Sequence, residues 1–388
     1  MTDKDINNLP AETGTAEDEA KTVILEYNAV DTVEQTHFKT LFSPGKNVIN
    51  QALMLAGNKN DLNNFINIHN EDKTKEYKVI KQNDTIEIEL NTNKYITSVT
   101  IGNINNIDIQ QSTPKLIDII FNHFTIDNIE KTKENKKIIL TSDELINKYK
   151  LFSRLEYLKR AIKDKTIINT LRNIGVVYNL KEENKEETIY FFIFQTIKIK
   201  ENKKAGNKEF SIELNISDDF IKLCEKMGTV YINKNSMSLN SVAYMLNSYF
   251  SEYIRTNINK YNQWKKYQIE IGGKKTKRYG IKISREAILK YLIKDYININ
   301  KHSKRDIQHY IIKLIEDISL MDSGKTYIVC RLEKNGDTDA TLKNIDDKKT
   351  ENEIELKEWL KGYYILLVED NYYKATKHIG KKTKEQNK

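Results

Sequence analysis

The stretch 281–333 constrains the fold of this chain most, because two helical patterns are followed there by a strand pattern. Ser284 precedes apolar residues at helical spacing, so we expect it to cap a helix. Polar residues then interrupt the pattern, and Ser303 is expected to begin a second helix with one apolar face. Residues 326–332 alternate between apolar and polar side chains, which is typical of a strand. The sequence therefore predicts two helices joined by a turn and followed by paired strands.

The second of these helices has a polar face suited to reading DNA. A helical repeat of about 100° per residue places Arg305, His309 and Lys313 opposite the apolar stripe, with Gln308 at its flank. Arg can form two hydrogen bonds to guanine, and Gln can form two to adenine. A helix-turn-helix followed by a β-hairpin is the winged-helix plan, in which the second helix enters the major groove. The alternative is a small α+β core unit with an ordinary solvated face.

Charge is distributed unevenly along the chain, which has 388 residues and a formal net charge of +8. Residues 1–80 contain 8 Lys and 13 Asp or Glu, which gives a net charge of −5. Residues 255–305 contain 15 Lys or Arg and 3 acids, which gives +12. The contrast favours an acidic N-terminal arm and a face that binds a polyanion. Ile, Asn and Lys dominate the composition, as an A/T-rich genome would produce, so part of the lysine excess carries no functional meaning.

A further basic feature lies between residues 265 and 280, where Lys and Arg flank glycines. Basic side chains neutralise phosphates and release counterions, and glycine lets the backbone approach them closely. We expect this stretch to contact the DNA backbone, with a solvated surface loop as the alternative. The candidate DNA-binding residues are Lys265, Lys266, Lys274, Lys275, Lys277, Arg278, Arg285, Lys301, Ser303, Lys304, Arg305, Gln308 and His309.

The sequence gives little support for an enzyme or a membrane protein. Gly324-Lys325-Thr326 resembles the end of a phosphate-binding loop, but the required earlier glycine is Ser319 and a strand pattern follows instead of a helix. The histidines never occur two residues apart, as they would in the metal site of a rolling-circle nickase. Cys224 and Cys330 lack the paired spacing of a zinc site. We expect no catalytic residue, metal or cofactor, and a cytoplasmic chain without a membrane span or signal peptide.

The patterns divide the chain into four parts within an α+β fold. Residues 1–35 are acidic and poor in apolar side chains, which favours a disordered arm. Residues 36–110 alternate in short runs and predict a small β-rich N-terminal region. Residues 111–235 and 236–388 each contain helical patterns followed by strand patterns. We therefore expect two tandem winged-helix domains, the second of which ends in a basic tail from Lys374.

Local signals predict the elements of the first of these domains. Pro114 favours the first turn of a helix, and Thr141 with Glu144 resembles a capping box. A helical run over 153–174 is expected to break near Asp164. Strands are expected over 176–180, 188–200 and 210–215.

This order of elements resembles the tandem winged-helix replication initiators of theta-replicating plasmids, the Rep protein family. The likeness rests on residues 112–215, on the junction from Phe210 to Leu239-Asn-Ser-Val-Ala-Tyr-Met-Leu-Asn-Ser-Tyr, and on 284–332 with its Lys304-Arg305-Asp306 opening. The resemblance implies that the first unit mainly dimerises and touches the DNA backbone. It also implies that the second unit reads repeated origin sites.

The hypothesis from the sequence is a DNA-binding protein without enzymatic activity that initiates plasmid or phage replication. It would bind origin repeats in double-stranded DNA as a homodimer or an array, and recruit host replication proteins such as the helicase or its loader. The first alternative is a transcriptional regulator or partition adaptor on the same scaffold. The second alternative is a rolling-circle nickase.

Overall fold

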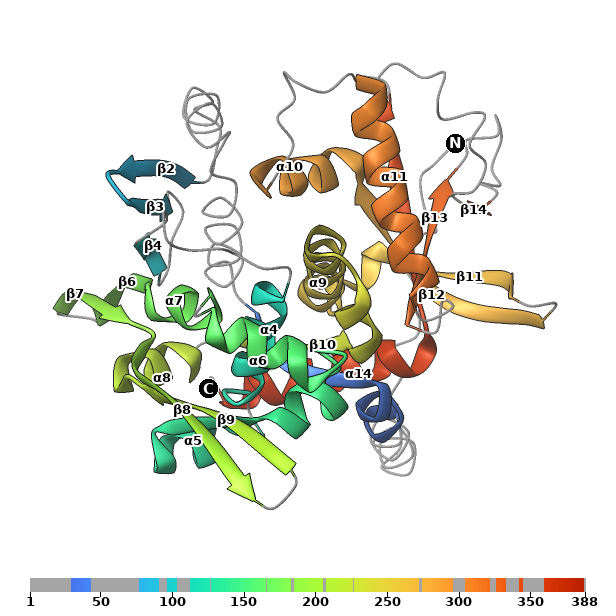
Figure 1. The fold of residues 1–388 in the computed structure, drawn as a ribbon. Helices are drawn as coiled ribbons and strands as arrows, with labels where there is room; N and C mark the ends of the chain where they lie inside the picture. Colours follow the sequence, from blue (N-terminus) through green and yellow to red (C-terminus); the bar gives the residue numbers. More distant parts are fainter. Residues whose placement is uncertain are drawn as a thin grey trace, which may run out of the picture.

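The structure is a computed structural model in which helices and antiparallel sheets alternate along the chain (Figure 1). The chain is a mixed α/β protein, in agreement with the expected class at this level. Within the described residues, no helix is long and apolar enough to span a membrane. The structure describes residues 29–42, 77–90, 96–102, 112–125, 127–164, 166–182, 185–204, 207–225, 227–271, 274–295, 304–321, 326–332, 342–344 and 359–386.

The first half of the chain, up to residue 225, contains a three-stranded antiparallel sheet. Strand β9 (Asn207–Ile216) lies in the middle of this sheet, between β5 (Lys137–Thr141) and β8 (Phe194–Lys204). The helices of this half are α4 (Thr113–Asn122), α5 (Ile129–Asn135), the π-helix η2 (Glu144–Lys148), α6 (Leu155–Lys163), α7 (Thr166–Arg172) and α8 (Asp218–Glu225).

Local sequence signals set the boundaries of these helices as predicted. Pro114 occupies the first turn of α4. Proline has no backbone N–H, and at this position an N–H would have no acceptor within the helix. The capping box forms, because the Glu144 N–H donates to Thr141 Oγ1 (3.1 Å) and the Thr141 N–H donates to Glu144 Oε2 (3.2 Å). The helical run 153–174 breaks at Asp164, which is the C-cap of α6.

A second sheet corrects the division predicted for the N-terminal part. Strand β4 pairs with β6, so β2, β3 and β4 belong to one five-stranded sheet with β6 and β7. The strands within residues 36–110 therefore do not form a separate region. The strand predicted over 188–200 is two strands, because the chain bends at the buried Ile193 and passes from one sheet to the other. The strands are β2 (Tyr77–Gln82), β3 (Thr85–Leu90), β4 (Ile96–Gly102), β6 (Ile174–Glu182) and β7 (Lys185–Phe192).

The second half is built on a five-stranded antiparallel sheet with the order β11-β12-β15-β13-β14. The helix predicted from Ser284 is α10 (Arg285–Asp295), and the Ala287 N–H donates to the Ser284 hydroxyl (3.1 Å). Helices α10 and α11 (Lys304–Leu320) both pack against α9 (Ser241–Asn257). The other elements are the 3₁₀ helices η3 (Lys234–Ser238) and η4 (Tyr261–Gln263), and the strands β11 (Trp264–Ile271), β12 (Lys274–Ser284), β13 (Tyr327–Leu332), β14 (Leu342–Asn344) and β15 (Tyr363–Val368).

A short strand pair joins the two halves. Strand β1 (His37–Phe42) pairs antiparallel with β10 (Gly228–Asn233) and with no other described strand. Residues 29–36 are helical, and Ala29 and Val33, four residues apart, are buried in the core. The prediction of disorder over 1–35 is therefore wrong for its last residues, since one turn of apolar side chains is enough to anchor them. Residues 1–28 lie outside the described residues.

Buried polar contacts at β1 connect segments that are remote in sequence. His37 Nε2 lies 3.0 Å from Thr326 Oγ1, and the Asn233 side-chain N–H donates to the same oxygen (2.8 Å). His37 Nδ1 lies 3.2 Å from the carbonyl oxygen of Val33. Burial lowers the pKa of His37 to about 4, although the hydrogen bond to Val33 opposes the shift. A neutral imidazole with its hydrogen on Nδ1 satisfies both contacts, because the Thr326 hydroxyl can then donate to Nε2.

The C-terminal segment is a helix and not the basic tail predicted from Lys374. Helix α14 (Asp370–Gln386) runs from the second half back towards the first (Figure 1). Ala375 and Ile379 are buried, and the Tyr372 hydroxyl donates to the carbonyl oxygen of Tyr231 on β10 (3.0 Å). The main apolar core extends from Val33 to Ile379 and spans both halves of the chain, and Cys330, Ile365 and Leu367 form a second, smaller cluster.

Candidate nucleic-acid interface

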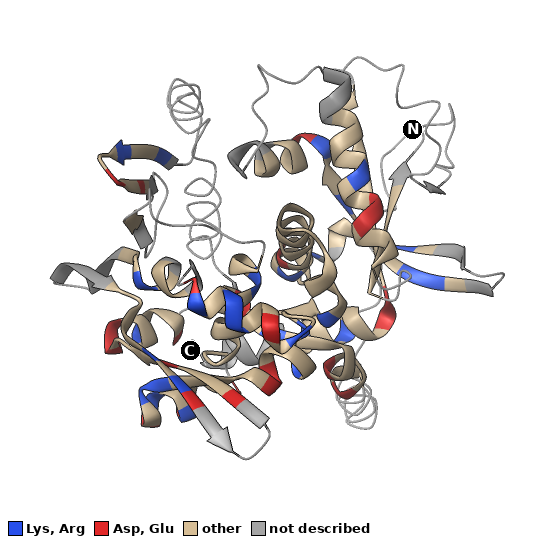
Figure 2. Ribbon diagram, in the orientation of Figure 1, with Lys and Arg blue, Asp and Glu red and all other residues tan. Residues whose placement is uncertain are grey.

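The β11–β12 hairpin carries much of the positive charge predicted for the interface. Residues 264–284 contain seven Lys or Arg and one acid, and Lys265, Lys266 and Lys277 are exposed. The hairpin projects from the body of the molecule, with basic residues along it (Figure 2). Lys274 and Lys275 lie near its tip by strand register, while their side chains lie outside the described part of the structure.

Aromatic packing anchors the base of this hairpin to helix α14. Tyr279 stacks on Tyr373 with ring centroids 4.1 Å apart, and Trp264 meets the same ring edge-on at 4.9 Å. Lys266 Nζ lies 5.2 Å from the centroid of Tyr279, within the range of a cation–π contact. The hairpin is therefore fixed at its base while Lys265, Lys266 and Lys277 remain exposed.

Two arginines predicted to contact DNA are buried instead. Arg278 is 8% exposed, because it alternates with the exposed Lys277 and so points to the other face of the sheet. There one of its N–H groups donates to the carbonyl oxygen of Leu367 (3.5 Å). Arg285 is 6% exposed, with its guanidinium 5.0 Å from the ring of Trp359 and 4.8 Å from that of Tyr364. Both predictions are wrong, since the two guanidinium groups make contacts inside the protein, with β15 and with Trp359.

Helix α11 presents only part of the predicted reading face. His309 and Lys313 are exposed, as the helical wheel predicts. Gln308 is 2% exposed, because it precedes Ile311, Ile312 and Ile315 by three, four and seven residues and so lies on the buried stripe. Its assignment as a base-contacting residue is wrong. Lys304 and Arg305 lie in the first turn, with side chains outside the described part, and Lys301 and Ser303 lie outside the described residues.

Charge is not uniform along α11. The exposed Lys313 is followed by Glu316 and Asp317, and Leu320 at the end of the helix is 77% exposed. The helix begins at the top of the molecule in Figure 1, while the β11–β12 hairpin projects beside its lower end. A helix of 17 residues is about 25 Å long. The first turn of α11 and the hairpin therefore lie near opposite ends of this helix.

Helix α6 carries basic residues that reasoning from the sequence missed. Arg160 and Lys163 are exposed, and Tyr157 beside them is 50% exposed. The signal was present in the sequence, because residues 154–165 contain five Lys or Arg and two acids.

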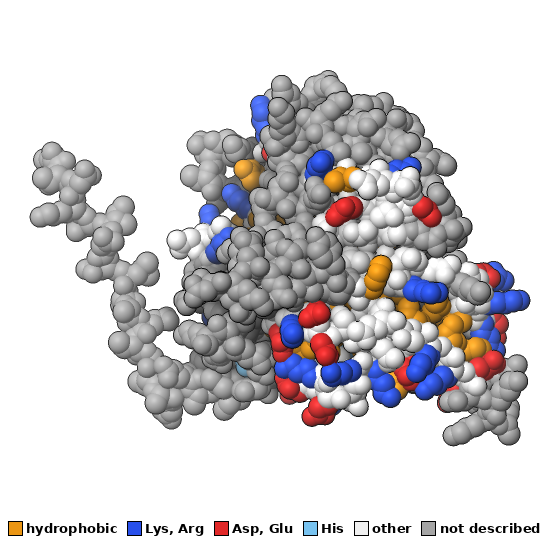
Figure 3. Space-filling view, turned by 90° about the vertical axis from the view of Figure 1, so that its left-hand side faces the viewer, with side chains coloured by type: hydrophobic (Ala, Val, Ile, Leu, Met, Phe, Trp, Pro, Cys, Tyr) orange, Lys and Arg blue, Asp and Glu red, His pale blue; other side chains and the backbone are white. Residues whose placement is uncertain are grey.

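On another face of the molecule, basic, acidic and apolar side chains are mixed in the described part, and no single sign of charge dominates there (Figure 3).

Within the described residues, no group of three or more His, Cys, Asp or Glu side chains could hold a metal ion. Cys224 and Cys330 are both buried, and burial raises the pKa of Cys330 to about 11. Family models, curated proteins and solved structures were compared with this chain, and none of them matches.

Proposed function

We propose that this chain is a sequence-specific double-stranded DNA-binding protein with two winged-helix units, which initiates plasmid or phage replication. The observation that supports this most is a strand order that occurs twice. In the first half the last strand, β9, lies between β5 and β8. In the second half the last strand, β15, lies between β12 and β13. In each half, helices separate the first of these strands from the other two, which is the winged-helix order.

The charge distribution supports the same proposal for the second unit. Helix α11 is the second helix after β12 and so takes the place of the recognition helix. It begins with Lys304, Arg305 and Asp306, and the N-terminal residues of such a helix are those that approach base edges. The length of α11, about 25 Å, is less than the ~34 Å of one turn of duplex. The first turn of α11 and the hairpin could therefore contact one duplex within a single helical turn.

The resemblance to the Rep family extends the proposal to its partners. The protein would bind repeated origin sites as a homodimer or an array, and recruit the host helicase or its loader. Binding and deformation of the duplex would be the mechanism, so no catalytic residue enters it.

Quantitative DNA binding tests the role of the hairpin. A preferred duplex is first selected from a random library and compared with a scrambled duplex at several salt concentrations. Replacing Lys265, Lys266 and Lys277 by Ala should weaken binding to both duplexes about equally. It should also flatten the dependence of log affinity on log salt by about 0.9 for each phosphate contact that is lost.

A second set of variants tests reading of the bases. Arg305→Ala should cost roughly 1–3 kcal/mol on the selected duplex and much less on the scrambled one. Gln308→Ala is the matched control, because the buried side chain should affect stability and leave the ratio of the two affinities unchanged. If no duplex is enriched, or if Arg305→Ala weakens both complexes equally, the assignment of α11 as the recognition helix is wrong.

A further inference from the structure

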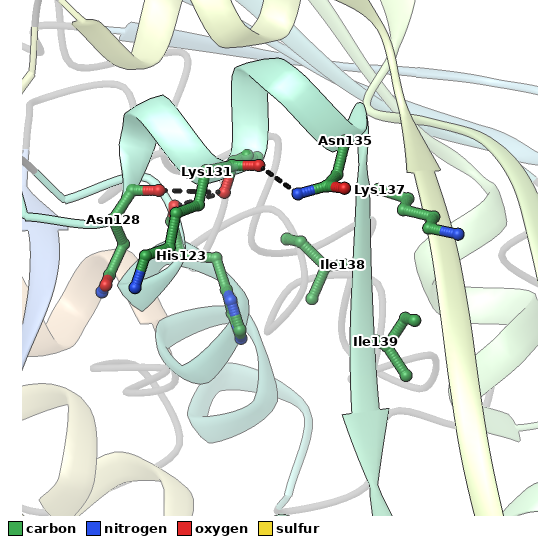
Figure 4. Close-up of a pocket in the computed structure, with 8 residues that line it drawn as sticks. His123, Asn128, Lys131, Asn135, Lys137, Ile138 and Ile139 are labelled. Carbon is green, nitrogen blue, oxygen red and sulfur yellow. Dashed lines mark hydrogen bonds between the residues drawn. The ribbon is translucent and has the colours of Figure 1, made fainter.

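A pocket of about 300 Å³ opens between α5 and β5, in the first half of the chain and outside the proposed interface (Figure 4). Lys136 has a left-handed conformation (φ 49°), and its N–H donates to the carbonyl oxygen of Thr132 (2.8 Å). This tight reversal makes the last turn of α5 and the start of β5 facing walls. The pocket is lined by His123, Asn128, Lys131, Thr132, Asn135, Lys137, Ile138 and Ile139.

The lysines near this pocket differ in their partners. Lys133 pairs with Glu130 (2.8 Å) and with Glu225, and Lys136 pairs with Asp218 (2.9 Å). The exposed Lys131 and Lys137 form no ion pair within the described residues, although the charge of Lys137 helps to lower the pKa of Glu213. The two lysines without an ion pair are the two that line the pocket. Two like charges at one small pocket favour an anionic occupant.

His123 provides a second, independent indication of a ligand. Its Nε2 is buried and has no hydrogen-bond partner within the described residues, which leaves its desolvation uncompensated. Burial lowers the pKa of His123, opposed by Glu144 and reinforced by Lys148, so the ring is neutral near pH 7 and can donate one N–H. In Figure 4 the His123 side chain lies below α5 and to the left of β5.

The remaining lining residues indicate what else the occupant contains. The Asn135 side-chain N–H donates to the carbonyl oxygen of Lys131 (2.7 Å), and that of Asn128 donates to the carbonyl oxygen of Asn122 (2.9 Å). The side-chain oxygens of both asparagines therefore remain as acceptors for hydroxyl groups. Ile139, which is 43% exposed, gives one wall an apolar surface. The pocket thus combines cationic groups, acceptors and an apolar wall.

We propose that this pocket binds a small phosphate monoester of the size of a mononucleotide. In Figure 4 the exposed side chains of Lys131 and Lys137 point to opposite sides of the pocket, and both would turn inward to place their ammonium groups on the phosphate, while Ile139 packs against the ring or carbon skeleton. The volume of about 300 Å³ is at the lower end of the range for small-molecule sites, which fits a ligand of this size.

Binding titrations of the full chain with adenosine 5′-monophosphate, inorganic phosphate and adenosine test this proposal. The monophosphate should bind most tightly, phosphate more weakly, and adenosine should show no saturable binding. The double variant Lys131→Gln, Lys137→Gln should weaken binding of the monophosphate about tenfold or more, since charge-assisted hydrogen bonds are lost. The double variant Lys163→Gln, Lys222→Gln is the matched control for net charge, because both lysines are exposed and neither lines the pocket. This control should bind as the unmodified chain does.

Proton NMR of the histidine side chains locates the site, because the chain has only 6 histidines. The monophosphate should shift the His123 signal and leave that of His309 on α11 unchanged. The proposal is overturned if adenosine binds as well as its monophosphate, if the double variant binds as the unmodified chain does, or if the His123 signal does not move. DNA affinity of the double variant should be unchanged, so a failure here is distinguishable from a failure of the proposed DNA-binding function.

Discussion

Acid should weaken the junction between the two halves through His37, whose side chain is almost fully buried at 5% exposure. The neutral ring accepts from Thr326 and donates towards the carbonyl oxygen of Val33. Protonation would add a charge at a buried site, close enough to Lys234 for repulsion, and burial is the main reason why the pKa falls from 6.5 to about 4. Between these two values the unfolded chain binds more protons than the folded chain. Stability should therefore decrease as the pH falls through this window.

The magnitude follows from the two pKa values of His37. Above pH 7.5 the ring is neutral in both states and contributes no pH dependence. At pH 5 the unfolded state is almost fully protonated and the folded state is mostly neutral, which costs about 2 kcal/mol of folding free energy. Below pH 4 the loss levels off at about 3 kcal/mol.

Urea denaturation at pH 7.5, 6 and 5 measures this loss for the unmodified chain and for His37→Gln. The variant cannot be protonated, so the stability advantage of the unmodified chain should shrink by about 2 kcal/mol between pH 7.5 and pH 5. His309→Gln is the matched control, because it makes the same substitution at an exposed position on α11, away from the junction. If His37→Gln loses as much stability on acidification as the unmodified chain, His37 is not the group responsible.

Two further predictions concern the hairpin and the N-terminal segment. Gly280→Ala should lower the free energy of unfolding by roughly 1–3 kcal/mol, because the added Cβ would lie 2.4 Å from Cε2 of Tyr267; an unchanged urea midpoint would contradict that close approach. A chain that begins at Ala29 should keep its stability and its DNA affinity, whereas one that begins at residue 43 should be less stable because β10 loses its partner strand. Equal urea midpoints for these two truncations would refute the role of β1. Tighter DNA binding after removal of residues 1–28 would instead identify them as an acidic arm that covers the basic face.

Elements that depend on neighbours a few residues away were predictable from the sequence. The spacing of apolar residues predicted α10 and α11, and the cap at Ser284 and the capping box at Thr141 formed where expected. These signals are local, because a helix places residues three and four apart on one face whatever the rest of the chain does. The exposure of His309 and Lys313 followed from the same geometry.

Whether a charged or polar side chain faces solvent was predicted less well. Gln308 lies at the edge of the apolar stripe. At such a position the helical wheel alone does not show whether a side chain is exposed or buried. Arg278 and Arg285 have the composition of a DNA contact, but aromatic rings and carbonyl groups from Trp359 to Leu367 enclose them. The sequence alone determined that this region is rich in positive charge. Only the tertiary structure decided which of those charges remain available to a ligand.

Strand partners were likewise decided by the tertiary structure. An alternating pattern predicts a strand but does not show which strand it pairs with. The pairing of β1 with β10 therefore had no local signal, and neither did the change of sheet between β7 and β8 at Ile193. The same holds for the pocket between α5 and β5, whose walls meet because Lys136 takes a left-handed conformation. The sequence by itself determined the order of helices and strands and the position of the basic stretches, since those depend on spacing along the chain. The tertiary structure determined sheet order, burial of individual charges and the shape of the sites, because those depend on contacts between residues far apart in sequence.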